Sequence, residues 1–309
     1  MNEPRRTALI AIDWGTTSAR AYRIDAAGEV LTARSAPLGI QAIRDGRFAD
    51  ALDALLGEWR ADPAPRIACG MIGSRQGWIE APYVDCPADL AGLGRTLART
   101  PGGELAVVPG ARCRDAAGVP DVLRGEETQL AGALLPEDER LLAVLPGTHC
   151  KWARVERGRL LEFATFMTGE LFAVLLEHSI LGRMSDRPAA PTAGEGPAFA
   201  RGVSRGLAGD GVTHAIFGAR TLALAGELAP ADVGDWLSGV LIGHEIHAAR
   251  AWAATRDHTT GPIRVIGGDA IVRRYVGALG QAGVAAERGA ADAAARGMFR
   301  IAQRAGLIH

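Results

Sequence analysis

The 309-residue sequence has few cysteines, no long apolar run and no excess of either charge. Its four cysteines, Cys69, Cys86, Cys113 and Cys150, show no CxxC spacing, which argues against a zinc site or a disulfide framework and favours reduced thiols in the cytoplasm. No apolar run reaches membrane-spanning length, so we expect no membrane partner. With Lys+Arg 34 against Asp+Glu 35, there is no basic excess to indicate a nucleic-acid partner.

The sequence also lacks a P-loop, because no Gly-Lys-Ser/Thr string follows a strand. It has instead a short apolar run, residues 8–12, that predicts a buried strand ending in Asp13. Gly15, Thr16 and Thr17 follow in a turn, and Arg20 opens a second strand. Small residues leave backbone N–H groups free to face an anion, and Asp13 could hold a hydrated Mg²⁺ beside phosphates. A hairpin with an ordinary polar turn is the alternative interpretation.

A second copy of this pattern begins at residue 141. An apolar run leads to Gly147 and Thr148, Lys151 opens the next strand, and an acidic turn with glycine precedes a third strand. An internal repeat of this size predicts two similar halves whose Gly-Thr loops face each other across the phosphates of a nucleotide. Lys151 is a candidate phosphate-binding cation, with the capping of a strand end as its alternative role. His149 is interpreted as a hydrogen-bond donor or spacer rather than a base.

Two further segments carry candidate chemistry. The strand 66–72 runs into a polar loop with Ser74, Arg75 and Trp78, followed by Tyr83. The planar fork of Arg75 suits a carboxylate, and the aromatic residues could form a wall of the same site. A surface loop with a solvated arginine is the alternative.

Gly125 followed by Glu126 and Glu127 predicts a helix start, where carboxylates are favoured by the helix dipole alone. Functionally, one of the pair would accept a proton from a substrate hydroxyl, and we favour Glu126.

The C-terminal half shows mainly helical patterns. Helices are expected over 199–207, 213–228 and 231–254, with small residues in the last that indicate tight packing. Gly267 and Gly268, between a strand and a helix, would let an adenine or ribose approach the backbone. His244, Glu245 and His247 are interpreted as structural. Residues 184–197 are expected to form a mobile connection, and an alanine-rich helix over 290–305 is expected to pack on the second half.

Taken together, these segments resemble the sugar kinase/Hsp70/actin superfamily, and within it the 2-dehydro-3-deoxygalactonokinase family. The most specific strings are Arg-Gly-Glu-Glu-Thr-Gln at 124–129 and Pro-Gly-Thr-His-Cys-Lys-Trp at 146–152. The resemblance implies an α/β fold with two ribonuclease H-like domains, 1–138 and 139–309, and an interdomain nucleotide cleft. The first would carry one phosphate loop and the sugar-acid loop, and the second would carry the other phosphate loop and the adenosine site.

The resemblance also implies an activity: phosphorylation of 2-dehydro-3-deoxy-D-galactonate by ATP and Mg²⁺ to the 6-phosphate, in galactonate and galactose catabolism. The usual base of the superfamily is an aspartate, whereas this sequence offers Glu126 and Glu127, with Asp13 as an alternative. Two other functions stay open: a kinase of another sugar acid such as 2-dehydro-3-deoxygluconate, and an actin- or chaperone-like ATP-gated switch. A homodimer is expected only from the general frequency of symmetric pairs.

Overall fold

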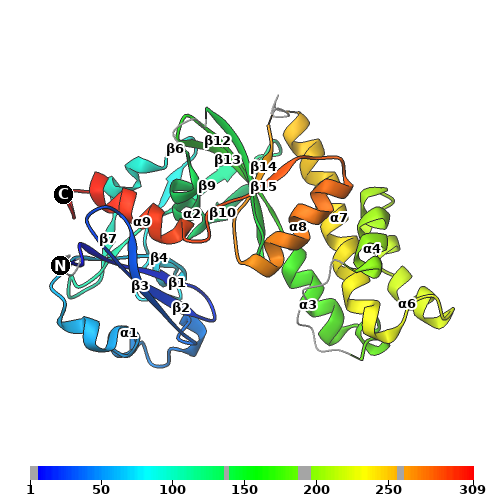
Figure 1. Cartoon of the computed structure of the whole chain (residues 1–309), viewed down its shortest axis with the longest axis horizontal. Coiled ribbons are helices and arrows are strands. Elements are labelled where there is room, and N and C mark those ends of the chain that lie inside the picture. The colour runs from blue at the N-terminus through cyan, green and yellow to red at the C-terminus, as the bar shows by residue number, and fades with distance from the viewer. Residues whose placement is uncertain (1–5, 136–138, 187–195, 256–260) are drawn as a thin grey trace, which may run out of the picture. The chain divides into compact units, whose positions relative to one another are not determined.

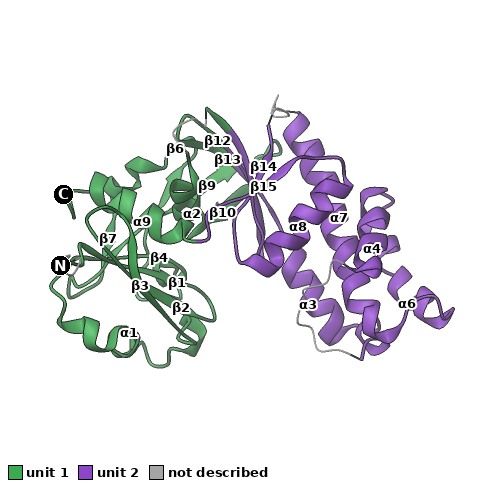
Figure 2. Cartoon of the chain, viewed as in Figure 1, with its two compact units in different colours: residues 1–140, 155–162, 292–309 green, residues 141–154, 163–291 purple. Residues whose placement is uncertain are grey.

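The computed structural model describes residues 6–135, 139–186, 196–255 and 261–309. Contacts divide the chain into two compact units, shown in Figure 2. Unit 1 consists of residues 1–140, 155–162 and 292–309, and unit 2 of residues 141–154 and 163–291. Most of the connection expected at 184–197 lies outside the described residues. The expected domain ranges stay a prediction, and the two units differ from them because two later segments pack with the first part of the chain.

A six-stranded sheet with the order β3-β2-β1-β4-β8-β7 forms the centre of unit 1 (Figure 1). Its first three strands form an antiparallel meander, while β4 and β8 run parallel to β1. The strands are β1 Leu9–Trp14, β2 Ala19–Ile24, β3 Val30–Ala36, β4 Arg66–Gly70, β7 Ala98–Arg99 and β8 Ala106–Val107. The two predicted strands of the opening hairpin are therefore confirmed.

Alternation along β1 sends its side chains to two different layers. Ile10, Ile12 and Trp14 point into a core completed by the apolar face of helix α1, Phe48–Leu56. Residues of the opposite face, which include Asp13, lie on the side contacted by helix α9, Ala293–Arg304. The apolar runs thus bury the sheet on both faces and leave the polar residues at its end.

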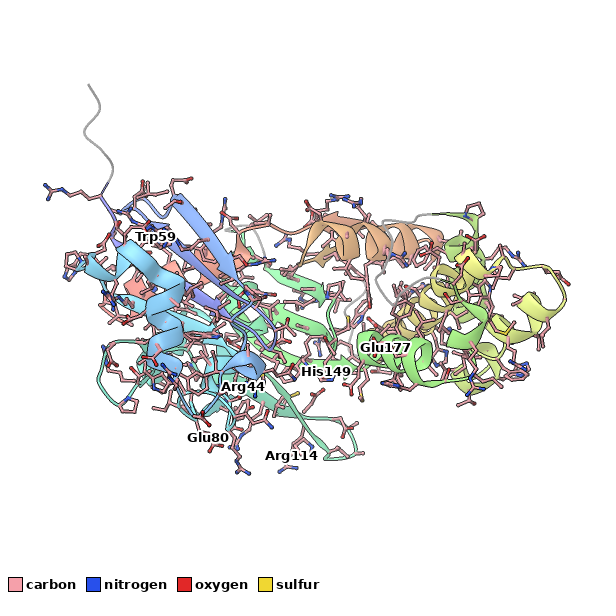
Figure 3. The ribbon with its side chains drawn as sticks, turned by 90° about the horizontal axis from the view of Figure 1, so that it is seen from below. Arg44, Trp59, Glu80, Arg114, His149 and Glu177 are labelled. Carbon is pink, nitrogen blue, oxygen red and sulfur yellow. The ribbon has the colours of Figure 1, made fainter. Side chains whose placement is uncertain are left out.

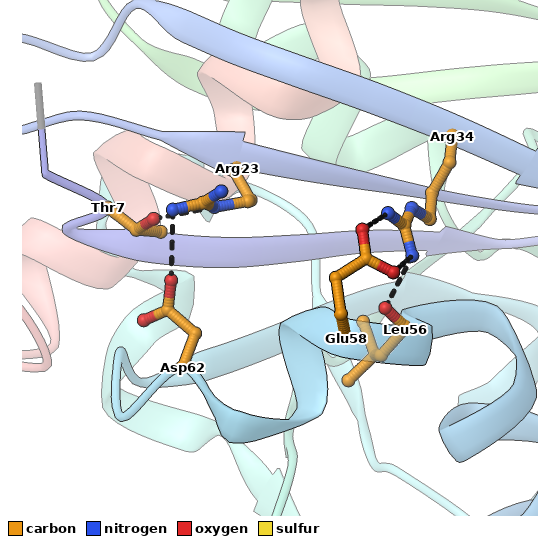
Figure 4. Close-up of polar contacts among 6 residues, drawn as sticks. All are labelled: Thr7, Arg23, Arg34, Leu56, Glu58 and Asp62. Carbon is orange, nitrogen blue, oxygen red and sulfur yellow. Dashed lines mark hydrogen bonds and ion pairs between the residues drawn. The ribbon is translucent and has the colours of Figure 1, made fainter. Parts of the chain in front are cut away.

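Two arginines fasten the segment after α1 to the sheet (Figure 4). Arg34 lies 3.7 Å above the Trp59 ring, donates to the Leu56 carbonyl oxygen at 2.5 Å and pairs with Glu58. Arg23 donates to Thr7 at 2.7 Å and lies 3.3 Å from an Asp62 oxygen. These contacts fix one side of the unit 1 core.

A three-stranded sheet in unit 1 has the order β10-β9-β5. Its strands are β5 Tyr83–Asp85, β9 Gly110–Arg114 and β10 Pro120–Leu123. Helix α2, Glu126–Ala133, begins three residues after β10 ends, as the sequence predicts. Short 3-10 helices complete the unit at Ile40–Ala42, Gly57–Ala61, Met71–Gly73 and Ala91–Thr96.

The second six-stranded sheet has the order β15-β14-β11-β12-β13-β6. Strands β11, β12, β13, β14 and β15 occupy the places that β1, β2, β3, β4 and β8 have in the first sheet, so the predicted repeat is confirmed in the topology. Strand β14 runs parallel to both β11 and β15. The strands are β6 Ala88–Asp89, β11 Arg140–Leu145, β12 Cys150–Glu156, β13 Arg159–Phe166, β14 Ile263–Val265 and β15 Ala286–Arg288.

Helices make up most of the rest of unit 2. They are α3 Thr168–His178, α4 Pro197–Leu207, α5 Val212–Ala215, α6 Gly218–Leu224, α7 Val233–Ala254 and α8 Asp269–Gln281, with 3-10 turns at Gly182–Met184 and Pro230–Asp232. The expected helix over 213–228 is wrong, because two short helices occupy it. Helices α4 and α7 pack closely through glycines: a Cβ at Gly202 would lie 2.1 Å from the Trp236 carbonyl oxygen.

The expected packing of the terminal helix on the second half is also wrong. Helix α9 packs against α2, β1 and β4, all in unit 1. Glycines allow this close approach, since a Cβ at Gly297 would lie 1.8 Å from the Thr128 carbonyl oxygen, and one at Gly132 would lie 1.8 Å from that of Ala293. The last helix therefore supports the helix that begins with Glu126 and Glu127.

Candidate functional site

Asp13 lies near the end of β1, on the face opposite the α1 core. It pairs in register with Arg20 of β2 and with Cys69 of β4, and the Cys69 thiol is 3.9 Å from Asp13 Oδ1. Burial raises the pKa of Asp13, while the Arg20 charge and the Cys69 contact oppose that rise. The carboxyl group of Asp13 is thus largely shielded from solvent and lies beside the positive charge of Arg20.

The turn after Asp13 is built as a tight loop with exposed hydroxyls. Gly15 N–H donates to the Ser18 carbonyl oxygen at 2.9 Å, and Thr16 and Thr17 are exposed. Residues 39–41 hold the loop from behind: Gln41 N–H donates to the Thr16 carbonyl oxygen at 3.1 Å, and a Cβ at Gly39 would lie 2.3 Å from that same oxygen. The loop is therefore fixed on one side and open on the other, as an anion site requires.

The start of α2 packs on the end of β4 through two glycines. Gly125 has φ 104° and Gly70 has φ 90°, conformations that side chains other than glycine rarely adopt. A Cβ at Gly125 would lie 3.2 Å from Gly70 Cα, and the Gly70 Cβ position lies 3.6 Å from Asp13 Oδ1. This close packing brings the first turn of α2 next to Asp13.

The two glutamates of that turn have different surroundings. Glu126 is half-buried, and its Oε2 accepts from Arg124 N–H at 2.9 Å. Glu127 is 0% exposed and accepts from Gly125 N–H at 2.7 Å and from Thr128 Oγ1 at 2.8 Å. Burial, and then the charge of Glu126, raise the pKa of Glu127 to about 8. Of the pair, Glu126 is the one that solvent reaches.

The loop that carries Ser74, Arg75 and Trp78 follows β4. Arg75 is 88% exposed, and its Nε lies 3.7 Å from an oxygen of Glu80, which is labelled in Figure 3. Trp78 stacks on Phe48 with 6.2 Å between ring centroids, so it packs against the core. The Ser74 hydroxyl is buried without a hydrogen-bond partner. Tyr83, on β5, lies beneath the guanidinium group of Arg124 at 4.3 Å.

In unit 2, the loop between β11 and β12 has the same support as the loop after Asp13. A Cβ at Gly169 would lie 2.3 Å from the Gly147 carbonyl oxygen, and Glu170 N–H donates to the Thr148 carbonyl oxygen at 3.0 Å. Gly147, Thr148 and His149 are exposed, and His149, which is labelled in Figure 3, contacts Glu170. Lys151 follows on β12 and is only 5% exposed.

Gly267 and Gly268 form an exposed turn from β14 into α8. The turn adjoins the Gly-Thr loop, since a Cβ at Gly267 would lie 3.8 Å from Pro146 Cδ. A Cβ at Gly147 or at Gly268 would meet no atom within 4 Å. Packing within the protein therefore does not explain the absence of a side chain at either position.

Comparison with known proteins identifies the family. The model of the 2-keto-3-deoxy-galactonokinase family matches residues 13–301. The 2-dehydro-3-deoxygalactonokinase of Escherichia coli K12 is 35% identical over 268 residues, which cover 86% of this chain and 87% of that protein. The chain belongs to the 2-keto-3-deoxy-galactonokinase family.

Solved structures agree with this assignment. A Sinorhizobium meliloti protein described as a candidate 2-dehydro-3-deoxygalactonokinase superposes with a TM-score of 0.85 at 35% identity, covering 96% of this chain and 98% of that one. Component A of the (R)-2-hydroxyglutaryl-CoA dehydratase of Acidaminococcus fermentans is 14% identical, with a TM-score of 0.52 and 95% coverage of each chain. The second likeness concerns the fold alone. The expected α/β fold of the sugar kinase/Hsp70/actin superfamily is confirmed.

In this family member, sequence reasoning missed several residues around Asp13. Tyr22 shares a strand face with Arg20, and burial followed by the Asp13 charge raises its pKa. The pKa of Cys69 lies well above its usual value because of burial, with further contributions from Asp13 and Glu127. The two-residue alternation of a strand places Tyr22 on the same face of β2 as Arg20, so the sequence could have indicated Tyr22. Cys69 and Arg124 had no such signal, because their neighbours come from distant parts of the chain.

Glu245 has a structural role, as expected. Its buried carboxyl group accepts from Cys150 at 2.9 Å, from Trp152 Nε1 at 2.7 Å, from Tyr275 OH at 2.8 Å and from Thr168. It therefore ties together β12, α3, α7 and α8. Across the four described ranges, no group of three or more His, Cys, Asp or Glu side chains could hold a metal ion. In the same ranges, none of the helices has the length and apolar character needed to cross a bilayer.

Proposed function

We propose that this chain transfers the terminal phosphoryl group of ATP to the terminal hydroxyl of 2-dehydro-3-deoxy-D-galactonate, giving the 6-phosphate, as a step of galactonate catabolism. The observation that carries the proposal is the packing of Asp13, the open Gly-Thr loop and the first turn of α2 at one end of the unit 1 sheet, in a chain of the 2-keto-3-deoxy-galactonokinase family. Anion-binding groups and carboxylates are thereby brought together, which is what phosphoryl transfer to a hydroxyl requires.

We assign phosphate binding to the Gly-Thr loop of each unit. In unit 1 these residues are Gly15, Thr16, Thr17 and Arg20, and in unit 2 they are Gly147, Thr148 and Lys151. The adenosine would contact the turn of Gly267 and Gly268. The empty space at the Cβ positions of Gly147 and Gly268 supports both assignments, because a ligand can approach the backbone there.

Asp13 is the proposed magnesium residue. Mg²⁺ usually binds proteins through one or two carboxylates and completes its shell with water and substrate phosphates, so a single carboxylate at a strand end beside a phosphate loop fits it. When bound, the ion would neutralise charge on the phosphates of ATP. Arg20, in register with Asp13, adds a second positive charge on the same face.

Glu126 is the proposed general base. A base must reach the hydroxyl that it deprotonates, and Glu126 is half-buried whereas Glu127 is 0% exposed and holds two hydrogen bonds inside the protein. Asp13 is the other candidate for the base, but as a magnesium residue its negative charge would interact with the ion and would be less available to accept a proton. The remaining contribution of the protein is positioning and charge neutralisation, since this reaction requires little covalent chemistry from the enzyme.

The sugar acid is assigned to the loop after β4 and its neighbour β5, with Ser74, Arg75, Trp78 and Tyr83. These residues come from the same unit as Asp13 and Glu126. The buried, unpartnered hydroxyl of Ser74 supports the assignment, because a ligand oxygen could supply the partner that the protein does not.

The position of the new phosphate tests the proposed reaction. The protein is incubated with Mg-ATP and 2-dehydro-3-deoxygalactonate, and the products are followed by ³¹P NMR. A monoester signal split by two protons, as expected for a phosphate on the terminal CH₂, would support the proposal. A phosphate split by one proton, or inorganic phosphate alone, would contradict it. The gluconate epimer, tested in parallel, gives the specificity.

A further inference from the structure

Arg124 is a half-buried arginine whose guanidinium group lacks part of its hydrogen bonding. It lies between β10 and α2, directly before Gly125. Its Nη2 donates to the Ala81 carbonyl oxygen at 2.8 Å, and its guanidinium group lies 4.3 Å above the Tyr83 ring. Its Nε and Nη1 are buried and have no hydrogen-bond partner. The protein therefore holds the guanidinium group through Nη2, whereas Nε and Nη1 have no acceptor.

The Ser74 hydroxyl, in the same unit, is also buried without a hydrogen-bond partner. Within the described ranges, four buried side-chain nitrogen or oxygen atoms lack a partner, and three of them belong to Arg124 and Ser74. Arg124 approaches the backbone next to Ser74, since a Cβ at Gly73 would lie 2.9 Å from Arg124 Nη1. Gly73 immediately precedes Ser74 in the chain. Two residues 50 positions apart in sequence thus leave donors unpaired in the same part of unit 1.

Such a cluster has a physical cost unless a ligand completes it. A buried donor without an acceptor loses its hydration and gains nothing in return, and the loss is largest for a charged group. A carboxylate is the acceptor that best offsets this cost, because a hydrogen bond from a charged guanidinium fork to an anion is stronger than one to a neutral group. The Tyr83 ring fixes the plane of that fork and so preorganises it.

We propose that Arg124, assisted by Ser74, binds the carboxylate of the 2-keto acid and so selects sugar acids over neutral sugars. The inference rests on the proposed function and names the residue that recognises its substrate class. Arg124 also precedes Glu126 by two residues, so the carboxylate anchor and the proposed base leave the backbone from one short segment. When the carboxylate of the acceptor binds Arg124, the terminal hydroxyl at the other end of the molecule remains available to Glu126.

Arg75, the arginine expected from the sequence to hold this carboxylate, has a different environment. It is 88% exposed and pairs with Glu80, which is itself 61% exposed. An ion pair between exposed groups contributes little free energy, and a solvated arginine loses little by staying unbound. Two nitrogen atoms of Arg124 are already desolvated, and its guanidinium group is held by Ala81 and Tyr83, so it gains more from a carboxylate.

The test compares Arg124→Lys with the native protein. Lysine keeps the charge and loses the fork, so we expect KM for the sugar acid to rise on the order of 10- to 100-fold while KM for ATP stays the same. Ser74→Ala should raise the same KM several-fold. Arg112→Lys is the matched control, because Arg112 is 54% exposed and pairs with Asp85 on the neighbouring strand, and it should leave both constants unchanged.

A second acceptor separates recognition from general damage. Replacing the carboxylate of the acceptor by a primary alcohol should raise KM for the native protein, and Arg124→Lys or Ser74→Ala should raise it no further with this acceptor. If Arg124→Lys does not fold, judged by thermal melting, the Ser74→Ala comparison supplies the result. The proposal is overturned if the variants affect both acceptors equally, or if Arg75→Lys produces the selective rise instead. If the Arg124 proposal fails but the native protein still phosphorylates the sugar acid, the proposed function stands. If the native protein neither binds nor phosphorylates the sugar acid, both the Arg124 proposal and the proposed function are overturned.

Discussion

At the scale of single residues, three carboxyl groups of unit 1 lie close together in different environments. Asp13 has a cation in register and a thiol nearby, Glu126 is half-buried, and Glu127 is enclosed with two hydrogen bonds. We propose that these environments divide the same side-chain chemistry among three functions: a magnesium residue, a base and a structural acid. Differences of environment, rather than residue type, separate the roles of neighbouring acids.

Replacing the two glutamates separates these roles. Glu126→Gln should lower kcat by about 10²- to 10⁴-fold, the usual contribution of a general base, with little change in KM for ATP. Glu127→Gln keeps the shape of a side chain that substrate does not reach, so its kcat should fall by less than about tenfold. Steady-state kinetics at saturating Mg-ATP measures both. A larger loss for Glu127→Gln would contradict the assignment.

Glu127 should also make stability depend on pH. Its pKa is about 8 in the folded protein, mainly because of burial, against 4.5 for a free side chain. Between these values the folded protein keeps a proton that the unfolded chain releases, so the free energy of unfolding falls as pH rises, by about 1.4 kcal/mol per pKa unit of the shift.

Glutamine does not titrate, so Glu127→Gln should lack this dependence. We expect its melting temperature, relative to that of the native protein, to increase from pH 5 to pH 8. Melting curves measured across that range would contradict the assignment if the two proteins kept a constant difference.

At the scale of elements, each Gly-Thr loop is held from behind by a glycine-bearing segment. Gly39 packs on the loop after β1, and Gly169 on the loop after β11. In both, a backbone N–H of that segment donates to a loop carbonyl oxygen. The loops are therefore supported by main-chain contacts, which leaves the exposed side of each free for phosphate.

Two glycines of unit 2 make a matched pair for testing this arrangement. A Cβ at Gly268 meets no atom within 4 Å, so Gly268→Ala should keep the native melting temperature and raise KM for ATP. A Cβ at Gly169 would lie 2.3 Å from the Gly147 carbonyl oxygen, so Gly169→Ala should lower the melting temperature. Thermal melting and ATP kinetics on both variants measure this. Equal melting temperatures, with unchanged KM for ATP at Gly268→Ala, would contradict the account.

Elements defined by local pattern could be predicted from the sequence. The opening hairpin, the start of α2 after Gly125 and the repeat of the hairpin at residue 141 follow from short-range spacing. Arg124 could not be found in this way, because its environment depends on Ala81 and Tyr83, more than 40 residues earlier. Likewise, the apolar stripe of α9 shows that the helix packs on something but does not identify its partner.

At the scale of the whole molecule, the chain builds two sheets that share the order of five strands and then returns to the first unit with α9. The last helix covers the face of the unit 1 sheet that carries Asp13, and it contacts α2 through Gly132 and Gly297. Residues at the C-terminus thus support a site whose acids come from the first half of the chain.

A substitution at this helix pair should therefore affect both stability and activity. A side chain at Gly297 would overlap the Thr128 carbonyl oxygen at 1.8 Å, so Gly297→Val should destabilise unit 1 by about 1–3 kcal/mol or more and lower kcat by shifting α2. Gly277→Val is the control, because a Cβ at Gly277 on α8 meets no atom within 4 Å. Denaturant unfolding and kinetics test the pair, and similar behaviour of the two variants would contradict the proposed role of α9.

The most direct test of the central claim is the dependence of ADP release on the acceptor. The native protein is given Mg-ATP with 2-dehydro-3-deoxygalactonate, its gluconate epimer, glycerol, xylulose or no acceptor, and ADP is followed by a coupled assay. We predict rapid release with the galactonate derivative and little without an acceptor. Steady ATP turnover that is indifferent to every acceptor would contradict a sugar-acid kinase and favour a protein that uses ATP to drive a conformational switch.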